Sequence, residues 1–526
     1  MRDKTKALLL SLFIMITITL IGCSNEAGGT ENDSTQGQEW GEVLNISVGQ
    51  QPGILDPALT TATATHDVAR AMYETLVTLD DNYEVIPMLA ESFEMSEDGK
   101  TITFPLRKAI KFHNGEEMTA DDVIASMERW MSISAQAQSD IPGAEWEKVD
   151  EDTVAVHLQA PSAISLYTIA EQNQLPIIVP KEIAEEAGAG AIEDYIGTGP
   201  LKLDEWRTDQ YIKFVKFKDY QPRSEEPTGL GGRKEALADE IYWHFVPDES
   251  TRVSGLISGE YDIILGLPYD NVGQIQDTDG LKTEIWPYGM EMLVFNKQEG
   301  TFADQKMRQA INAALDVESI LYASFGDEQF FELEHGVFTP EIKAWYTDAA
   351  KDKYNMQNED LAQQLIEESG YDGEEIVILA TREYPHFYSA AVATLEQLEN
   401  LGLNVSLELY DLATMLDRRD DPELWDIFFT GWNTQFIPQG YSFLDSKAGW
   451  AGWTNSEKID QYLDDISKAP TMEEASALAS DLQEEFWDYL PIINVGLFHN
   501  VAGMKENVTG FRNFIGPLLW NVGIEE

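Results

Sequence analysis

The chain has 526 residues, of which 93 are acidic and 35 are basic, and its net charge is −58. A surface of this charge repels phosphate backbones, which excludes nucleic acid as a partner. The 43% hydrophobic content is typical of a globular protein, and the length exceeds what one core supports, so we expect two or three domains. Cys23 is the only cysteine, so the rest of the chain holds no disulfide and no cysteine-based metal site.

The first 23 residues have the order of a bacterial export signal. Three basic residues precede an apolar stretch from Ala7 to Ile21, which is shorter than the roughly 20 residues needed to span a bilayer. The run Leu20-Ile21-Gly22-Cys23 resembles a bacterial lipobox. This resemblance implies that residues 1–22 are removed, that Cys23 carries lipid, and that the protein faces outward from a cell membrane, or into the periplasm of a Gram-negative cell. An ordinary signal peptide with a chance cysteine is the alternative.

Polar residues and the pattern of apolar residues predict the elements that follow. Residues 24–39 are mostly Gly, Ser, Thr, Asn, Gln and acid, which is typical of a flexible tether. Alternating or continuous apolar residues predict strands at 43–48, 102–106, 154–158, 376–379 and 405–409. Helices are predicted from about Ala120, from Asp248 to Gly259, and over 304–315, 360–369 and about 387–401. This mixture predicts an α/β chain.

Two local signals support the predicted helix boundaries. Thr119-Ala120-Asp121-Asp122 has the pattern of a capping box, in which the first and fourth side chains bond each other's backbone N–H groups. Gly259 and Gly370 follow two of the helical patterns and are suited to the left-handed conformation that ends a helix.

The common catalytic and cofactor motifs are absent from the sequence. It contains no H-E-x-x-H, G-x-S-x-G or G-x-G-x-x-G pattern and no phosphate-binding loop. The seven histidines are scattered, with no pair at the spacing of metal ligands. We therefore expect a protein that is not an enzyme and that uses neither a metal nor a cofactor.

Several ordered blocks carry a family resemblance. The longest begins with Phe104-Pro105-Leu106-Arg107, Lys111-Phe112-His113-Asn114-Gly115 and Thr119-Ala120-Asp121-Asp122-Val123. Further blocks follow at 196–200 with Trp206, 250–252, 258–262, 295–296, 302–304, 307–310, 429–432 and 455–460. Together they resemble family 5 of the bacterial extracellular solute-binding proteins, which are dipeptide-, oligopeptide- and nickel-binding components of ABC importers.

The resemblance implies an α/β fold of three domains. It is a periplasmic-binding-protein-like fold, with two lobes around a cleft and an additional domain inserted into the first lobe. Lobe I would comprise residues 40–78, 198–288 and 493–526. The inserted domain would comprise residues 79–197, and lobe II residues 289–492. The ligand would lie between the lobes and be buried when they close about a hinge.

The resemblance also implies a function. The chain would be a monomeric, lipid-anchored receptor that captures a di- or oligopeptide and delivers it to the permease of an ABC importer. One alternative is the same receptor for a different small solute, such as an opine-like acid, an oligosaccharide or a metal chelate. A second alternative is a receptor for a peptide signal.

Two positions of the family pattern concern the ends of a bound peptide. Arg382 lies where the family places an arginine for the carboxylate, which a guanidinium can bind through two hydrogen bonds. Gln435 follows Gly431-Trp432 at about the position of the aspartate that binds the α-amino group, and it cannot neutralise an ammonium. Asp426 and Asp445 are possible substitutes.

Other residues are predicted to line the cleft. Thr63 and Thr65 would offer hydroxyl groups from lobe I, and Tyr288 would lie near the hinge. Aromatic walls are predicted from Trp432, Tyr384 and Trp345.

Overall fold

The computed structural model describes residues 40–525, and from Trp40 onward the chain forms one compact unit. Cys23 and the predicted tether at 24–39 lie outside the described residues. The domain boundaries given above therefore stay a prediction, and the lobe names are used here with those boundaries.

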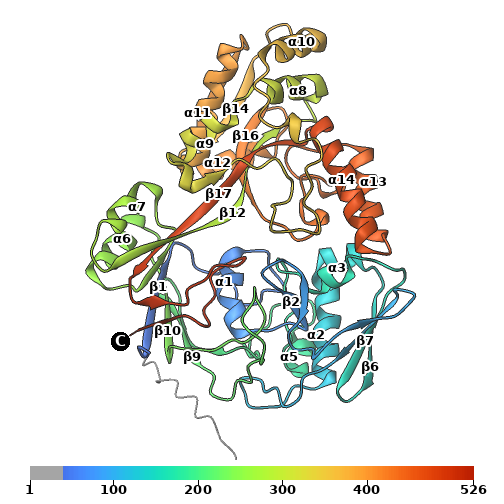
Figure 1. The fold of residues 1–526 in the computed structure, drawn as a ribbon, viewed down its shortest axis with the longest axis vertical. Helices are drawn as coiled ribbons and strands as arrows, with labels where there is room; N and C mark the ends of the chain where they lie inside the picture. The colour runs from blue at the N-terminus through green and yellow to red at the C-terminus, as the bar shows by residue number, and fades with distance from the viewer. Residues whose placement is uncertain (1–39, 526) are drawn as a thin grey trace, which may run out of the picture. The chain divides into compact units, whose positions relative to one another are not determined.

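One large mixed sheet passes through both lobes (Figure 1). It has eleven strands, in the order β15-β14-β16-β12-β17-β11-β1-β10-β9-β8, with β13 paired to β17 outside this path. Their bounds are β1 Val43–Val48, β8 Leu201–Arg207, β9 Tyr211–Lys216, β10 Glu240–Phe245, β11 Ile263–Leu265, β12 Leu281–Phe295, β13 Phe331–Glu332, β14 Ile376–Thr381, β15 Val405–Tyr410, β16 Ile427–Asn433 and β17 Ile492–Lys505.

The antiparallel pair β12 and β17 joins the two ends of this sheet. Figure 1 shows the two strands side by side, running from the strands around β1 toward β14 and β16. Their register shifts between Pro287 and Gly289 and again between Glu291 and Met292. A Cβ on Gly289 would lie 2.5 Å from the carbonyl oxygen of Trp432. Only glycine therefore fits where β12 passes β16 at the first irregularity.

Smaller sheets and helices complete the fold. A four-stranded sheet in the order β4-β5-β7-β6 lies in the inserted domain, and two hairpin pairs are β2 with β3 and β18 with β19. Their bounds are β2 Val77–Leu79, β3 Val85–Pro87, β4 Glu94–Met95, β5 Thr101–Pro105, β6 Glu145–Asp150, β7 Thr153–His157, β18 Val508–Thr509 and β19 Gly523–Ile524. The helices are α1 Thr63–Met72, α2 Ala120–Ile133, α3 Ala135–Asp140, α4 Ser165–Ile169, α5 Lys181–Ala187, α6 Glu249–Ser258, α7 Tyr269–Gln276, α8 Gln305–Ala314, α9 Val317–Phe325, α10 Glu359–Ser369, α11 Pro385–Asn400, α12 Leu412–Arg419, α13 Glu457–Lys468 and α14 Met472–Tyr489.

The local signals for helix boundaries are confirmed. The Asp122 carboxylate accepts a hydrogen bond from the Thr119 backbone N–H at 2.8 Å, so α2 begins with the predicted capping box. Gly259 and Gly370 follow α6 and α10 with φ values of 84° and 79°, in the left-handed region that favours glycine.

Buried apolar side chains of the described residues gather in three clusters. One contains much of lobe II together with the middle of β12 and β17, a second lies around the four-stranded sheet, and a third lies around β1 and β10. The loops and strand ends between these clusters hold the candidate site.

Candidate ligand-binding cleft

Two adjoining cavities lie where the lobes meet. The interlobe cavity has a volume of about 580 Å³, and the lobe II pocket has a volume of about 490 Å³. Tyr288, Gly431 and Asn433 line both. The interlobe cavity is also lined by Thr61, Thr63, His66, Arg70, Tyr83, Ala135, Gln136, Glu171, Gln172, Asn173, Gln174, Pro287, Trp432, Thr434, Gln435, Phe436, Gln439, Gly440, Ser442, Asn513 and Ile515.

The lobe II pocket lies at the carboxyl ends of parallel strands. β14 is parallel to both β15 and β16, and Thr381 at the end of β14 and Thr430 in the middle of β16 lie on the pocket wall. This edge of a parallel sheet is where ligands commonly bind, because the connecting loops diverge there. The other lining residues are Leu379, Ala380, Tyr384, His386, Phe387, Leu412, Met415, Leu416, Arg419, Phe428, Phe429, Phe498 and Asn500.

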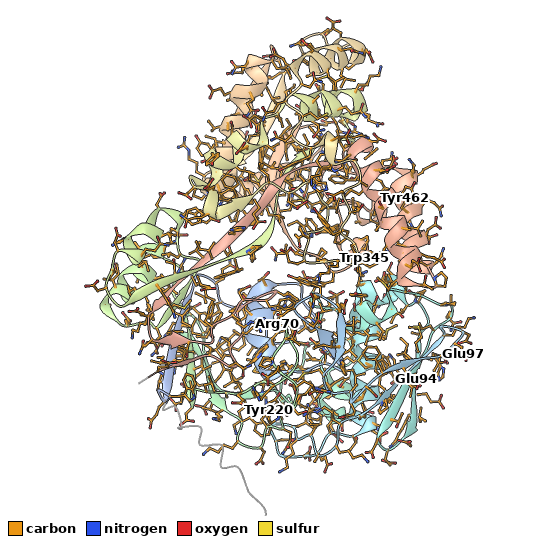
Figure 2. The ribbon with its side chains drawn as sticks, in the orientation of Figure 1. Arg70, Glu94, Glu97, Tyr220, Trp345 and Tyr462 are labelled. Atoms are coloured by element: carbon orange, nitrogen blue, oxygen red, sulfur yellow. The ribbon has the colours of Figure 1, made fainter. Side chains whose placement is uncertain are left out.

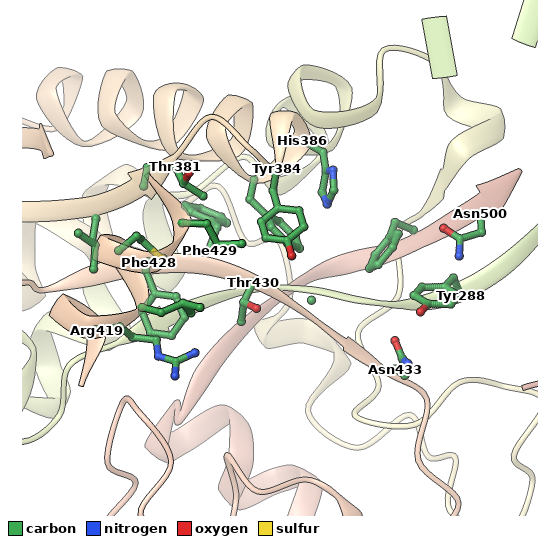
Figure 3. A pocket seen from close by; sticks show the side chains of 18 residues that line it. Tyr288, Thr381, Tyr384, His386, Arg419, Phe428, Phe429, Thr430, Asn433 and Asn500 are labelled. Atoms are coloured by element: carbon green, nitrogen blue, oxygen red, sulfur yellow. The ribbon is translucent and has the colours of Figure 1, made fainter. Parts of the chain in front are cut away.

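Most of this pocket is apolar, with charged or amide side chains at its two ends and the polar atoms of Thr430, Tyr384 and His386 between them. Figure 3 shows Arg419 at one end and Tyr288, Asn433 and Asn500 at the other. Burial lowers the pKa of His386 to about 4, so this imidazole is neutral at pH 7. The pocket therefore suits an apolar group of a ligand whose charged or polar ends reach Arg419 or the shared residues.

Gly431 keeps the pocket open between two aromatic rings. A Cβ at this position would lie 3.1 Å from the Phe498 ring and 3.2 Å from the Phe387 ring. These distances are shorter than ordinary van der Waals contacts, so a side chain here would displace one of the two pocket walls.

Tyr288 connects lobe I to the shared wall. Burial, and then the nearby Asp67 carboxylate, raises the pKa of Tyr288, while hydrogen bonding to the Asn433 and Thr63 side chains opposes this rise. The phenol is therefore protonated at neutral pH, and it lies among polar groups of both lobes.

Asp67 and Arg70 face each other on α1, with side chains that are 17% and 5% exposed. Asp67 Oδ1 is 3.8 Å from Arg70 Nη1, which exceeds hydrogen-bond length, and this oxygen has no hydrogen-bond partner within residues 40–525. Burial raises the pKa of Asp67 to about 7 and lowers the pKa of Arg70 to about 10. Arg70 itself reaches the interlobe cavity, and Figure 2 shows it on the lobe I side of the molecule.

Comparison with known proteins identifies the family. The model for "Bacterial extracellular solute-binding proteins, family 5 Middle" matches residues 84–455. The chain belongs to family 5 of the bacterial extracellular solute-binding proteins. The family predicted from the ordered sequence blocks is thus confirmed, and so is the two-lobe α/β fold class.

Curated relatives match along nearly the whole chain. A probable peptide ABC transporter periplasmic-binding protein, y4tO of Sinorhizobium fredii, is 27% identical over 492 residues, covering 89% of this chain and 91% of the relative. The glutathione-binding protein GsiB of Salmonella typhimurium is 25% identical over 491 residues, with the same coverage.

Solved structures share the fold. The protein AgaA from A. tumefaciens R10, in complex with agropinic acid, is 25% identical with a TM-score of 0.72, covering 92% of this chain and 99% of that one. The ABC transporter substrate-binding protein CtaP of Listeria monocytogenes is 20% identical with a TM-score of 0.82, and the match covers 93% of this chain and 100% of that one.

The structure brings five of the predicted ligand residues of this family 5 protein to the cavities. Thr63, Tyr288, Trp432 and Gln435 line the interlobe cavity, and Tyr384 lines the lobe II pocket. The Trp432 indole packs edge-on against the rings of Trp450 and Phe443, at centroid distances of 5.3 and 5.6 Å, which fixes its position on the wall.

Three other predicted residues lie elsewhere among the described residues. Thr65 is fully buried, and its hydroxyl donates to the carbonyl of Ile54 at 2.8 Å. Trp345 is 1% exposed, and its indole N–H donates to the carbonyl of Phe436 at 2.5 Å (Figure 2). The Arg382 side chain is exposed and lies over the Tyr388 ring, 5.3 Å from its centroid, and is not among the described residues that line either cavity.

The two suggested substitutes for the missing aspartate are also placed away from the cleft. Asp426 accepts a hydrogen bond from the Val377 backbone N–H at 2.8 Å and lines a separate acidic depression on lobe II. Asp445 accepts from the Lys447 backbone N–H at 2.8 Å, at the start of a short 3₁₀ turn. Each carboxylate stabilises local backbone.

Sequence reasoning missed Arg419 and Glu171, which also line the cavities. Neither residue belongs to a recognisable local pattern, and acidic residues are abundant in the chain. The signal that could have identified Arg419 is its place at the end of a helix that follows a strand of the parallel sheet.

Within residues 40–525, no three His, Cys, Asp or Glu side chains are grouped closely enough to hold a metal ion. No helix in this part of the chain is long and apolar enough to cross a membrane.

Proposed function

We propose that this protein is the lipid-anchored receptor of an ABC importer, and that it captures a short peptide outside the membrane and delivers it to the permease. The observation that carries this proposal is the pair of adjoining cavities between the lobes, with a polar chamber beside an apolar pocket. A polar backbone with an apolar side chain fits such a pair. The names of the relatives y4tO and GsiB, which refer to a peptide and to glutathione, support a peptide ligand.

The membrane attachment and oligomeric state belong to the same proposal. Lipid on Cys23 would hold the receptor at the outer face of the cell membrane, and the receptor would act as a monomer that releases its ligand chemically unchanged. The lipobox pattern Leu20-Ile21-Gly22-Cys23 supports the lipid.

A second candidate ligand is an opine-like acid. AgaA, with agropinic acid bound, is as similar in sequence to this chain as GsiB is, at 25% identity. The glutamine at position 435 favours this candidate, because an amide cannot neutralise the ammonium group of a peptide.

Ligand binding distinguishes these candidates. We expect native mass spectrometry and calorimetric titration of the purified protein to show binding of at least one of Ala-Phe, Ala-Ala-Phe and glutathione, and recovery of that ligand unchanged after incubation. Binding of agropinic acid but none of the peptides would move the ligand to the opine class. Hydrolysis of a bound peptide would contradict the receptor function.

Two arginines are candidates for the ligand's carboxylate. If Arg382 holds the carboxylate, Arg382→Ala should weaken the binding of a peptide acid by roughly 10- to 100-fold, as when one charge-assisted hydrogen-bonding group is removed. Holding the carboxylate would require Arg382 to leave the ring of Tyr388, whereas Arg419 already lines the pocket.

Arg419→Ala in the same titration is therefore the matched comparison. If Arg382→Ala binds normally and Arg419→Ala binds weakly, the carboxylate site is at Arg419. If neither substitution matters, no carboxylate is held at this end of lobe II.

A further inference from the structure

The loop from Glu171 to Gln174 brings a buried carboxylate to the wall of the interlobe cavity. Glu171 is 7% exposed, and its Oε1 accepts hydrogen bonds from the backbone N–H groups of Gln172 and Asn173, at 3.0 and 2.6 Å. Within residues 40–525 only Oε1 accepts hydrogen bonds of ordinary geometry, although the nearby Gln174 backbone N–H also favours the ionised carboxylate. Oε2 is not among the oxygens there that are sealed from solvent without a partner. The carboxylate is thus fixed through one oxygen, while the other is available to the cavity.

No cation among the described residues is paired with Glu171. Arg70 lines the same cavity, but its Nε donates to Gln172 Oε1 at 3.4 Å and its Nη1 to the Ile515 carbonyl at 3.4 Å. A buried carboxylate without a counter-charge is costly to ionise. Burial accordingly raises the pKa of Glu171 to about 7, and nearby Asp140 contributes to this rise.

The same loop contacts Gln435, where the family pattern has an aspartate. Asn173 Nδ2 donates to Gln435 Oε1 at 2.8 Å, and Gln435 Nε2 donates to the Asn433 carbonyl at 3.0 Å. The Gln435 amide is therefore occupied by protein contacts that join the inserted domain to lobe II. Glu171 is therefore two residues along the chain from Asn173, and the Asn173 side chain contacts Gln435 at the position expected for the ligand's ammonium group.

We propose that Glu171 binds a primary ammonium group of the ligand and supplies the negative charge that Gln435 lacks. This proposal rests on the proposed receptor function and defines its ligand class: a solute that carries a primary amine, such as the free amino terminus of a peptide. An ammonium group could donate to the free Oε2 of Glu171 while backbone N–H groups hold Oε1.

The test compares free and blocked amines on matched variants. Glutathione and Ala-Ala-Phe, each with a free and with an acetylated amino group, are titrated into the wild-type protein, Glu171→Gln and Asp140→Asn. Glutamine keeps an acceptor for the backbone N–H groups and removes the charge. Asp140 is a second buried carboxylate in the same region that is not among the described residues lining the cavity, so Asp140→Asn controls for the loss of a buried charge.

We expect Glu171→Gln to weaken the binding of the free-amine ligands by roughly 10- to 100-fold. Acetylation should weaken binding to the wild-type protein by a similar factor, and the acetylated ligands should bind wild type and Glu171→Gln alike. Asp140→Asn should change the binding of free amines little, because Asp140 acts on Glu171 only through a contribution to its pKa that is smaller than that of burial. Equal losses in Glu171→Gln and Asp140→Asn, or normal binding by Glu171→Gln, would overturn the assignment while the receptor function stands. If none of these ligands binds the wild-type protein, the proposed peptide function itself fails.

Proton release is an independent measure of the same contact. With a pKa of about 7, roughly half of the Glu171 side chains carry a proton at pH 7. An ammonium ligand favours the ionised carboxylate, so binding should release up to about half a proton, seen by calorimetry in buffers of different ionisation enthalpy. Asp67 and Asp140 also titrate nearby, whereas His66, with its pKa lowered to about 4, stays neutral and Arg70 stays charged. No difference in proton release between wild type and Glu171→Gln would contradict the proposal.

Discussion

Asp56→Asn is expected to lower the free energy of unfolding by about 3–5 kcal/mol, because it leaves a buried cation without its partner. Asp56 is fully buried in the loop before α1, and its Oδ2 lies 2.5 Å from Arg129 Nη2 on α2, where the arginine side chain is 4% exposed. Asp56 also accepts the backbone N–H groups of Ala58 and Ile192. The pair thus ties lobe I to the inserted domain.

Urea denaturation at pH 7 measures this effect. The control is Asp219→Asn, which removes an ion pair to Lys111 in which both side chains are about half exposed, and such pairs contribute only about 0–1 kcal/mol. Replacing Arg129 by methionine in the Asp56→Asn background should recover part of the loss, since the unpaired charge is then absent. A change below about 1 kcal/mol in Asp56→Asn would show that Arg129 finds another partner.

Glu291→Gln is expected to stabilise the protein at high pH. Glu291 lies on β12 at the second register shift and is fully buried. Its Oε1 accepts from the Ser324 hydroxyl at 3.2 Å, and its Oε2 has no partner within residues 40–525. Burial raises the pKa of Glu291 from 4.5 to about 8. Ionising this carboxylate is therefore much harder in the folded protein than in the unfolded chain.

The direction of the pH dependence follows from this shift. Below pH 4.5 the side chain is protonated in both states and contributes no pH dependence. As the pH rises from 4.5 to about 8, the unfolded chain loses its proton first, so stability is lost. Above about pH 8 the carboxylate is ionised in both states, and the folded protein bears the full free-energy cost of ionising it. Glutamine removes this cost, so Glu291→Gln should raise the free energy of unfolding there by on the order of 4 kcal/mol.

Urea denaturation at pH 5, 7 and 9 tests this expectation, with the exposed Glu484→Gln as the control. The stability difference between Glu291→Gln and wild type should grow with pH, whereas Glu484→Gln should follow wild type throughout. Parallel curves for Glu291→Gln and wild type would mean that Glu291 ionises in the fold at ordinary pH.

Local sequence patterns predicted those elements whose boundaries are set by neighbouring residues. The helix that begins after Thr119 and the helices that end at Gly259 and Gly370 are of this kind. β12 and β17 were not predicted. Nearly every residue of β17 is buried on both faces, so its sequence does not alternate between apolar and polar residues as a half-buried strand does.

The site was predicted only as far as the family resemblance reaches. Thr63, Tyr288 and Trp432 follow from family positions, and the structure places them on the cavity wall. Glu171 and Arg419 depend instead on contacts between segments far apart in the chain. Nothing in the neighbouring sequence distinguishes Glu171 from the chain's many exposed acidic residues.

The position of β17 in the sheet has a consequence for when the protein can fold. β17 separates the four strands β15-β14-β16-β12 from the five strands β11-β1-β10-β9-β8, yet it is formed by residues 492–505, late in the chain. Before this segment arrives, β11 and β12 each have an unpaired edge, and the sheet consists of two unconnected pieces. A chain that is synthesised from its amino terminus therefore cannot join the two pieces of the sheet until residues 492–505 have emerged, which makes the folding of both lobes a late event.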